Sequence, residues 1–287
     1  MSSNVSPEPQ RIVFIGGGNM ARSLIGGMIA RGVPAANIAV VEPVSAARNA
    51  LSQQFGVSAV GSPDSVAGNA GIVVLAVKPQ VMRSVCAALH PLLPANALLV
   101  SVAAGIRSDQ IDHWTGGERA IVRVMPNTPA LLGAGAAGLY ANSRVSQRQR
   151  QDAESLMQST GLVRWIDEEA RMDAVTALSG SGPAYVFLLA EAMQAAAEAQ
   201  GLDADTARAL AAQTVLGAAR MLTESGEEAA ELRRRVTSPN GTTHAAIQSF
   251  EDDGFRAMVD RAIKAATERG RSLSAEFGDA ADDRRDA

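Results

Sequence analysis

The chain has 287 residues, a net charge of −4, 47% hydrophobic residues and 20% charged residues. This length favours two domains, because one hydrophobic core rarely grows beyond about 250–300 residues. The charge argues against a nucleic-acid partner, which needs a basic face. One cysteine, Cys86, excludes an internal disulfide, and three widely spaced histidines predict no metal site.

Both ends of the chain are polar. Residues 1–10 contain two prolines and no apolar run, and residues 278–287 read GDAADDRRDA. We therefore expect a flexible N-terminus over 1–10 and a disordered tail over 278–287. No apolar segment reaches the roughly 18 residues that a membrane span needs, so the sequence predicts no membrane partner and a cytoplasmic protein.

Residues 11–167 alternate short apolar runs with amphipathic segments. Strands rich in Val, Ile and Leu, separated by helices, are typical of a mostly parallel sheet covered on both faces. The sequence therefore predicts a Rossmann-type, doubly wound α/β domain over 11–167. The expected strands are 11–16, 38–43, 57–60, 71–79, 97–105, 119–126, 133–141 and 162–167, and the expected helices are 19–32, 45–56, 80–89 and 147–161.

Residues 168–277 lose the strand pattern and predict an all-α domain. Helices are expected at 184–200, 204–225, 242–254 and 255–277. The first is apolar almost all round, which predicts burial on most sides. These helices are too apolar for one small bundle to hide, so we expect a homo-oligomer interface here. The alternative is that they pack on the first domain. The basic run LRRRV at 232–236 is interpreted as a solvated helix face.

The segment IGGGNMA at 15–21 follows an expected strand and opens an expected helix. It fits the dinucleotide pattern G-x-G-x-x-G/A, in which Gly16 makes the turn, Gly18 admits a pyrophosphate and Ala21 packs the helix on the strand. The helix N-terminus then offers N–H groups to phosphate. The predicted phosphate-binding residues are Gly16, Gly17, Gly18, Asn19, Met20 and Ala21.

Cofactor preference is left open by the end of the second strand. Glu42 stands where an acid accepts the ribose hydroxyls of NAD and repels the extra phosphate of NADP. Ser45 and Arg48 lie just beyond it and are candidates to bind that phosphate.

Two later strand ends are expected to meet the same ligand, because ligands of doubly wound sheets lie at the carboxyl ends of strands. AVKPQ at 76–80 places Ala76, Val77, Lys78 and Pro79 there, with Lys78 able to reach a phosphate or ribose. A solvated lysine is the alternative. SVAAG at 101–105 leaves room beside Ala103 and Ala104 for a nicotinamide ring.

Two further loops open helices of the second half, LSGSGPAY at 178–185 and TSPNGTT at 237–243. The first is neither a nucleophile elbow nor a P-loop. The hydroxyl and N–H groups of both loops at helix starts suit a small carboxylate, with ordinary helix capping as the alternative. The predicted substrate-binding residues are Ser179, Gly180, Ser181, Gly182, Asn240, Gly241, Thr242 and Thr243.

Neither loop holds a histidine or a carboxylate. A dehydrogenase that acts on an alcohol must move a proton off oxygen, usually with a histidine or a lysine. A site of hydroxyl and N–H groups instead suits a substrate that is already electrophilic, such as a protonated C=N, with a hydroxyl orienting the nitrogen or relaying a proton. Hydride can add directly to the carbon of such a group.

The motifs FIGGGNMA, AVKPQ, SVAAGI, RVMPNTPA, SGSGPAY and SPNGTT occur in the order and spacing of pyrroline-5-carboxylate reductases, which the chain resembles over about residues 11–275. The resemblance implies reduction of L-1-pyrroline-5-carboxylate to L-proline, the last step of proline biosynthesis, usually with NADPH. It implies a dimer through the helical domain, often assembled into decamers. It places Asn127 in the cleft between cofactor and substrate as a further substrate-binding residue, and it gives Thr243 the catalytic hydroxyl.

The chain departs from the family pattern at three places. Asn240-Gly241 replaces a usual Gly-Gly, Arg233-Arg234 replaces a usual Lys-Asp, and Glu42 weakens the expectation of NADPH. Two rival functions remain: a reductase of another cyclic imine or of a 3-hydroxy acid, and a non-catalytic nucleotide-binding regulator. The hydroxy-acid version would want a lysine or histidine on the helix after residue 183, which the sequence lacks.

Overall fold

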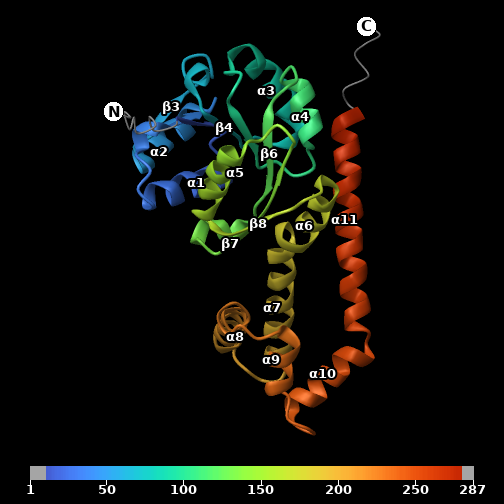
Figure 1. The fold of residues 1–287 in the computed structure, drawn as a ribbon. Helices are drawn as coiled ribbons and strands as arrows, with labels where there is room; N and C mark the ends of the chain where they lie inside the picture. Colours follow the sequence, from blue (N-terminus) through green and yellow to red (C-terminus); the bar gives the residue numbers. More distant parts are fainter. Residues whose placement is uncertain (1–10, 280–287) are drawn as a thin grey trace, which may run out of the picture. The chain divides into compact units, whose positions relative to one another are not determined.

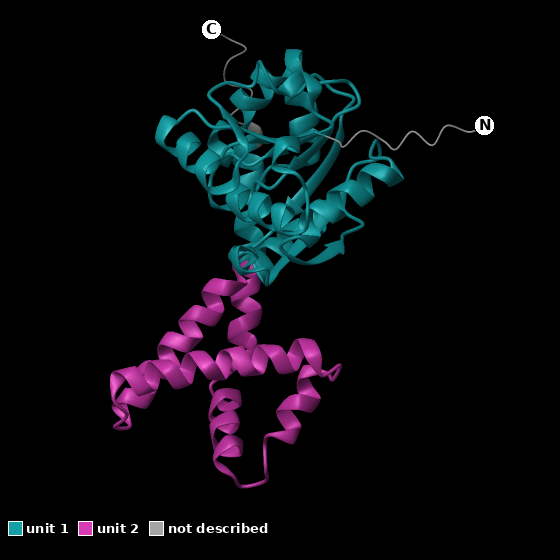
Figure 2. Cartoon of the chain, turned by 90° about the vertical axis from the view of Figure 1, so that its left-hand side faces the viewer, with its two compact units in different colours: residues 1–180, 266–287 teal, residues 181–265 magenta. Residues whose placement is uncertain are grey.

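A computed structural model describes residues 11–279, which divide into two compact units. Unit 1 ends at Gly180 and takes in the chain again from Ala266, and unit 2 is Ser181–Ala265 (Figure 2). Residues 278 and 279, assigned above to a disordered tail, belong to the last helix. The expectations for 1–10 and for 280–287 lie outside the described residues.

Unit 1 contains an eight-stranded sheet in the order β3-β2-β1-β4-β5-β6-β7-β8 (Figure 1). Neighbouring strands are parallel except β6 and β7, so the predicted doubly wound, mostly parallel sheet is confirmed. The strands are β1 Ile12–Ile15, β2 Ile38–Val41, β3 Ser58–Val60, β4 Ile72–Leu75, β5 Leu98–Ser101, β6 Ala120–Met125, β7 Gly135–Ala141 and β8 Gly161–Trp165.

Helices cover both faces of this sheet, because successive strand side chains point to opposite sides. Phe14 belongs to one buried cluster with residues of α1, α2 and α5, and Val13 belongs to the other with residues of α3 and α4. The helices are α1 Asn19–Ala30, α2 Ser45–Phe55, α3 Pro79–Leu89, α4 Ser108–Trp114 and α5 Gln147–Gln158. Helix α4 has no counterpart among the expected elements, since its seven residues SDQIDHW carry little apolar periodicity.

Unit 1 extends past the boundary expected between residues 167 and 168. The short helix α6 (Met172–Val175) and the π-helical turn Thr176–Gly180 (η6) pack against the sheet, with Met172 and Ala177 fully buried. The end of the last helix also belongs to unit 1, where Ser274 is buried. The compact units therefore divide after Gly180, and the chain later returns to unit 1.

Unit 2 is helical and buries few of its apolar side chains. Its helices are α7 Gly182–Ala199, α8 Ala204–Glu224, α9 Ala229–Arg235 and α10 Thr242–Asp252, followed by α11 Phe255–Asp279, which ends in unit 1. The prediction that α7 is buried on most sides is wrong for one chain: none of its residues is buried, and Phe187 and Leu188 are each 66% exposed. Among the described residues, no helix is long and apolar enough to cross a membrane.

Candidate functional site

The glycine loop between β1 and α1 requires its first glycine. Gly16 has φ +99°, and a Cβ there would lie 2.6 Å from the backbone oxygen of Ala76. The Gly16 N–H donates to the oxygen of Val41 at 2.8 Å, which fixes the loop between β2 and β4. Only glycine fits this left-handed backbone pressed against the neighbouring strand end.

The third glycine faces open space. Gly18 is the N-cap of α1, no side chain caps that helix, and a Cβ at Gly18 would meet no atom within 4 Å. Ala21, one turn on, is fully buried against the sheet. The first N–H groups of α1 therefore lie beside an open surface, which is the arrangement that admits the pyrophosphate of a dinucleotide.

Glu42 is held directly beside this loop. One carboxylate oxygen, Oε2, accepts from the Gly17 N–H at 3.1 Å, and the other, Oε1, accepts from the Val44 N–H at 3.0 Å. Arg48 donates through Nη1 to the backbone oxygens of Glu42 and Pro43, at 2.8 and 2.7 Å. Ser45 is exposed in the first turn of α2.

The two other predicted strand ends lie on the same side of the sheet. Strand β4 pairs with β1 in parallel, so Ala76 to Pro79 follow it next to the glycine loop, with the Ala76 N–H donating to the Ile15 oxygen at 2.9 Å. Lys78 is exposed at the N-cap of α3. Ala103 and Ala104 follow β5, the next strand. The sheet thus brings together the predicted cofactor residues of unit 1.

Asn127 bridges two backbone segments of unit 1. Its Nδ2 donates to the Ser179 oxygen at 3.0 Å, and its Oδ1 accepts from the Ala136 N–H at 2.9 Å. Ser179 also donates its hydroxyl to the Val175 oxygen at 3.0 Å. The sequence predicts direct substrate contacts for both residues, whereas these bonds make Asn127 a buried support for the 179–180 backbone.

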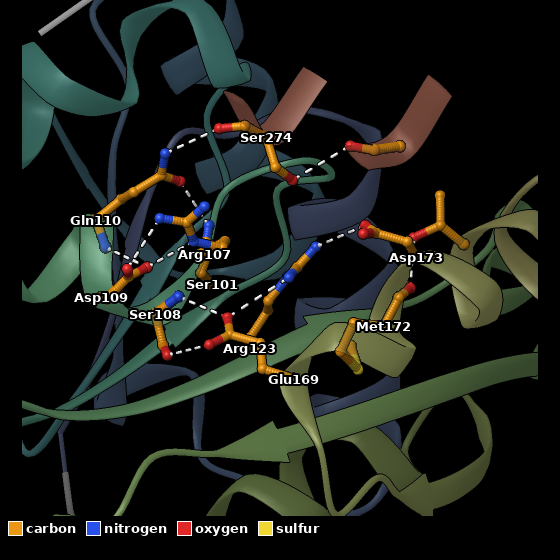
Figure 3. Close-up of polar contacts among 12 residues, drawn as sticks. Ser101, Arg107, Ser108, Asp109, Gln110, Arg123, Glu169, Met172, Asp173 and Ser274 are labelled. Atoms are coloured by element: carbon orange, nitrogen blue, oxygen red, sulfur yellow. Dashed lines mark hydrogen bonds and ion pairs between the residues drawn. The ribbon is translucent and has the colours of Figure 1, made fainter. Parts of the chain in front are cut away.

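A buried ionic cluster supports the same segment, and the sequence reasoning missed it (Figure 3). Arg123, a charge inside strand β6, lies 3.5 Å from the Glu169 carboxylate and 3.6 Å from that of Asp173. Ser108 donates its N–H and its hydroxyl to Glu169, at 2.7 and 2.6 Å. The detectable signal was an arginine inside the otherwise apolar run AIVRVM. Because Asp173 lies in α6, the cluster ties the turn that carries Ser179 to the sheet.

The edge of this cluster reaches helices α4 and α11. The Arg107 guanidinium donates to Asp109 at 2.9 Å, and this hydrogen bond lowers the pKa of the Asp109 carboxyl. Gln110 donates through Nε2 to the Ser274 oxygen at 3.0 Å (Figure 3). Burial, together with the nearby carboxylates of Glu169 and Asp109, raises the pKa of Tyr140. This part of unit 1 thus joins the final helix to the sheet.

The second predicted substrate loop lies in unit 2. Asn240 has φ +58°, a left-handed conformation that asparagine tolerates, whereas the backbone of Gly241 is extended. Gly241 is the N-cap of α10, no side chain caps that helix, and Thr242 and Thr243 are exposed in its first turn. Within unit 2, the starts of α7 and α10 are well separated (Figure 1). One chain therefore does not bring residues 181–182 and 240–243 together.

The parallel sheet, its left-handed glycine and the open N-terminus of α1 define a dinucleotide-binding protein of the Rossmann class. The sequence profile described as NADP oxidoreductase coenzyme F420-dependent matches residues 11–105, and that described as pyrroline-5-carboxylate reductase dimerisation matches residues 169–273.

Relatives extend the likeness over nearly the whole chain. A pyrroline-5-carboxylate reductase of Pseudomonas aeruginosa is 52% identical over 268 residues, covering 93% of this chain and 98% of that protein. A solved pyrroline-5-carboxylate reductase of Coxiella burnetii is 43% identical with a TM-score of 0.89, covering 93% of this chain and 99% of the other. The pyrroline carboxylate reductase of Plasmodium falciparum with NADP bound is 29% identical with a TM-score of 0.82, covering 93% and 99%. The chain belongs to the pyrroline-5-carboxylate reductase family.

Proposed function

We propose that the chain is an NAD(P)H-dependent oxidoreductase that reduces the C=N bond of L-1-pyrroline-5-carboxylate and forms L-proline, the last step of proline biosynthesis. The observation that carries this function is the 52% identity to a pyrroline-5-carboxylate reductase over 93% of the chain. The intact glycine loop agrees with it, because Gly16 and Gly18 have the conformation and the open space that a bound dinucleotide needs.

The residues present fit the cofactor. The N–H groups at the start of α1 are free to bind the pyrophosphate, and Lys78 is exposed at the end of β4 to pair with a phosphate or ribose oxygen. Of the two alanines assigned to the nicotinamide ring, Ala104 is half-buried after β5, whereas Ala103 is buried in the apolar cluster on one face of the sheet. When bound, the reduced nicotinamide supplies the hydride that adds to the imine carbon.

The substrate carboxylate is assigned to N–H and hydroxyl groups of the loops 179–182 and 240–243. These loops hold the ring at the distance of about 3–3.5 Å that hydride transfer needs, so positioning provides most of the rate. Thr243 is assigned the hydroxyl that orients the ring nitrogen. Neither loop carries a strong base, which agrees with a substrate whose nitrogen is already protonated.

A second copy of the chain is needed to complete this site. The starts of α7 and α10 are apart within unit 2, and the exposed apolar side chains of α7 provide a surface for a partner. The match to a dimerisation profile over residues 169–273 supports a homodimer through the helical half. Further assembly into decamers follows from the resemblance alone, and a mass measurement in solution tests it.

The experiment is an absorbance assay at the band of the reduced nicotinamide, with purified protein and L-1-pyrroline-5-carboxylate. Cofactor oxidation that depends on this substrate, with formation of L-proline, is expected. Imines of other ring size and 3-oxo acids are the comparison substrates, because faster turnover of one of them would assign the enzyme to a related reaction. Binding of NAD(P)H without oxidation by any of them would indicate a nucleotide-binding regulator. A cytoplasmic location is part of the proposal and is tested by fractionation.

A further inference from the structure

We propose that Glu42 makes this site select a dinucleotide with a free adenosine 2′-hydroxyl, NAD(H), over its 2′-phosphorylated form, NADP(H). The inference rests on the dinucleotide site of the proposed function and concerns which cofactor that site prefers. It does not depend on which imine the enzyme reduces.

Glu42 stands at the end of β2, where proteins of this fold bind the adenosine ribose of a dinucleotide. Glu42 directly follows strand β2, and its Oε2 accepts from the Gly17 N–H of the glycine loop at 3.1 Å. Its Oε1 accepts from the Val44 N–H at 3.0 Å. Two backbone donors, one on each oxygen, hold the group beside the cofactor loop, and each oxygen keeps acceptor capacity for a ribose hydroxyl.

A fixed carboxylate discriminates between the two cofactors by charge. A 2′-hydroxyl donates a hydrogen bond to it, which is a strong bond because the acceptor is ionised. A 2′-phosphate has no comparable donor and brings a charge of about −1.5 to −2 at neutral pH. Since Glu42 is half-buried, the repulsion between carboxylate and phosphate is only partly screened.

Arg48 is the one basic residue in the segment 38–55 that could offset this repulsion. Its Nη1 donates to the backbone oxygens of Glu42 and Pro43, at 2.8 and 2.7 Å. Arg22, on the neighbouring helix α1, is bound to the Gln54 side chain at 3.0 Å and to the Ala47 oxygen. Both guanidinium groups thus support the backbone around α2.

The start of α2 is the other feature that could attract a phosphate. Val44 is its N-cap and no side chain caps it. The Val44 N–H, at the entrance to this helix, already donates to Glu42. The negative side chain of Glu42 therefore lies at the start of α2, in the place proposed for a 2′-phosphate. Its carboxylate, rather than a phosphate, interacts with the positive end of the helix dipole.

The test is calorimetric binding of NADH and NADPH, with ADP-ribose and its 2′-phosphate as probes without a nicotinamide. The wild type is expected to bind NADH at least about tenfold more tightly than NADPH, and ADP-ribose more tightly than its 2′-phosphate. Glu42→Gln removes the charge and keeps the size, and is expected to shift the ratio toward NADPH by about tenfold. Glu42→Asp keeps the charge and the preference for NADH.

Glu118→Gln is the matched control, because it removes the same charge from an exposed position of unit 1 and should leave the ratio unchanged. Arg48→Met tests the rival interpretation: a selective loss of NADPH affinity would show that Arg48 binds the phosphate. Such a loss in Arg48→Met would overturn the proposal. Tighter binding of NADPH than of NADH by the wild type, or an unchanged ratio in Glu42→Gln, would also overturn it. Because binding is the readout, a protein that bound NADH preferentially but reduced no pyrroline-5-carboxylate would contradict only the proposed function.

Discussion

Arg123 on strand β6 lies 3.6 Å from Asp173 on helix α6, and both side chains are almost completely buried. Asp173 precedes the π-helical turn Thr176–Gly180, whose Ser179 oxygen accepts the side-chain N–H of Asn127. The ion pair and the amide bridge together hold the unit 1 part of the proposed substrate loop against the sheet.

Asp173→Ala is expected to destabilise the protein by about 3–5 kcal/mol, because it leaves the buried Arg123 without one of its two carboxylates. Asp205→Ala is the control: it removes an exposed partner of Arg208, and a change of at most about 1 kcal/mol is expected. Urea unfolding measures both. Equal losses in the two variants would show that the buried pair has no special structural role.

The sequence predicts the sheet of unit 1 well because its strands are continuous apolar runs bounded by clear turn residues. The glycine loop is equally predictable from the sequence, since Gly16 has a positive φ of a kind that favours glycine. Helix α4 and the ionic cluster could not be predicted in this way. Their residues are polar or charged, and they are joined by long-range contacts such as Ser108 with Glu169, which no local pattern contains.

The proposed substrate site was only partly predictable for a different reason. The motifs locate Ser179 and Thr243 in the chain but not in space, and a single chain separates the starts of α7 and α10, beside which the two loops lie. Likewise, the apolar composition of α7 predicts burial, whereas the residue exposures show that burial would require a partner. Completion of the substrate site and burial of α7 both depend on assembly of the chains, which no local sequence pattern specifies.

Two substitutions in the glycine loop are expected to impair the protein in different ways, one by lowering stability and the other by blocking cofactor binding. Gly16→Ala should lower the free energy of unfolding by about 1–3 kcal/mol, because its Cβ would meet the Ala76 oxygen and its backbone is left-handed. A side chain at position 18 would lie in open space, so Gly18→Asp should keep the wild-type free energy of unfolding and lose NAD(P)H binding. Thermal unfolding and cofactor titration separate the two effects. Undiminished titration of Gly18→Asp would contradict the loop assignment.

The hydroxyl of Thr243 is expected to make a modest contribution to turnover. Thr243→Ala should lower kcat by about two- to tenfold, the range for one net hydrogen bond of about 0.5–1.5 kcal/mol. Thr243→Ser keeps the hydroxyl and should retain most of the rate. Steady-state kinetics at saturating cofactor make the comparison. A wild-type rate in Thr243→Ala would remove this residue from the mechanism.

The exposed apolar side chains of α7 are expected to lie in the dimer interface. Phe187→Glu should shift the protein toward monomer, because a charge would be buried against the partner. Gln194→Lys is the control and should leave the mass unchanged, because Gln194 is a polar residue of the same helix that donates to Glu198 within one chain. Sedimentation equilibrium measures the mass. A Phe187→Glu variant that stays fully dimeric would place the interface elsewhere.

Cys86 is expected to make the free energy of unfolding fall at high pH. Burial raises the pKa of its thiol from 9.0 to about 12, so the unfolded chain loses the proton at lower pH than the folded chain. Between pH 9 and 12 the wild type should therefore lose about 1.4 kcal/mol of unfolding free energy per pH unit more than Cys86→Ala. Denaturant titrations across this range test it. Parallel pH profiles for the two proteins would show that the thiol is not buried as described.

The most direct test of the proposed reaction follows the hydride itself. The protein is incubated with L-1-pyrroline-5-carboxylate and nicotinamide cofactor deuterated on the transferred position, and the product is examined by mass spectrometry and NMR. The proposal predicts L-proline that carries one deuterium on the former imine carbon, formed in equal amount to the oxidised cofactor. Cofactor oxidation without labelled proline, or no substrate-dependent oxidation at all, would contradict it.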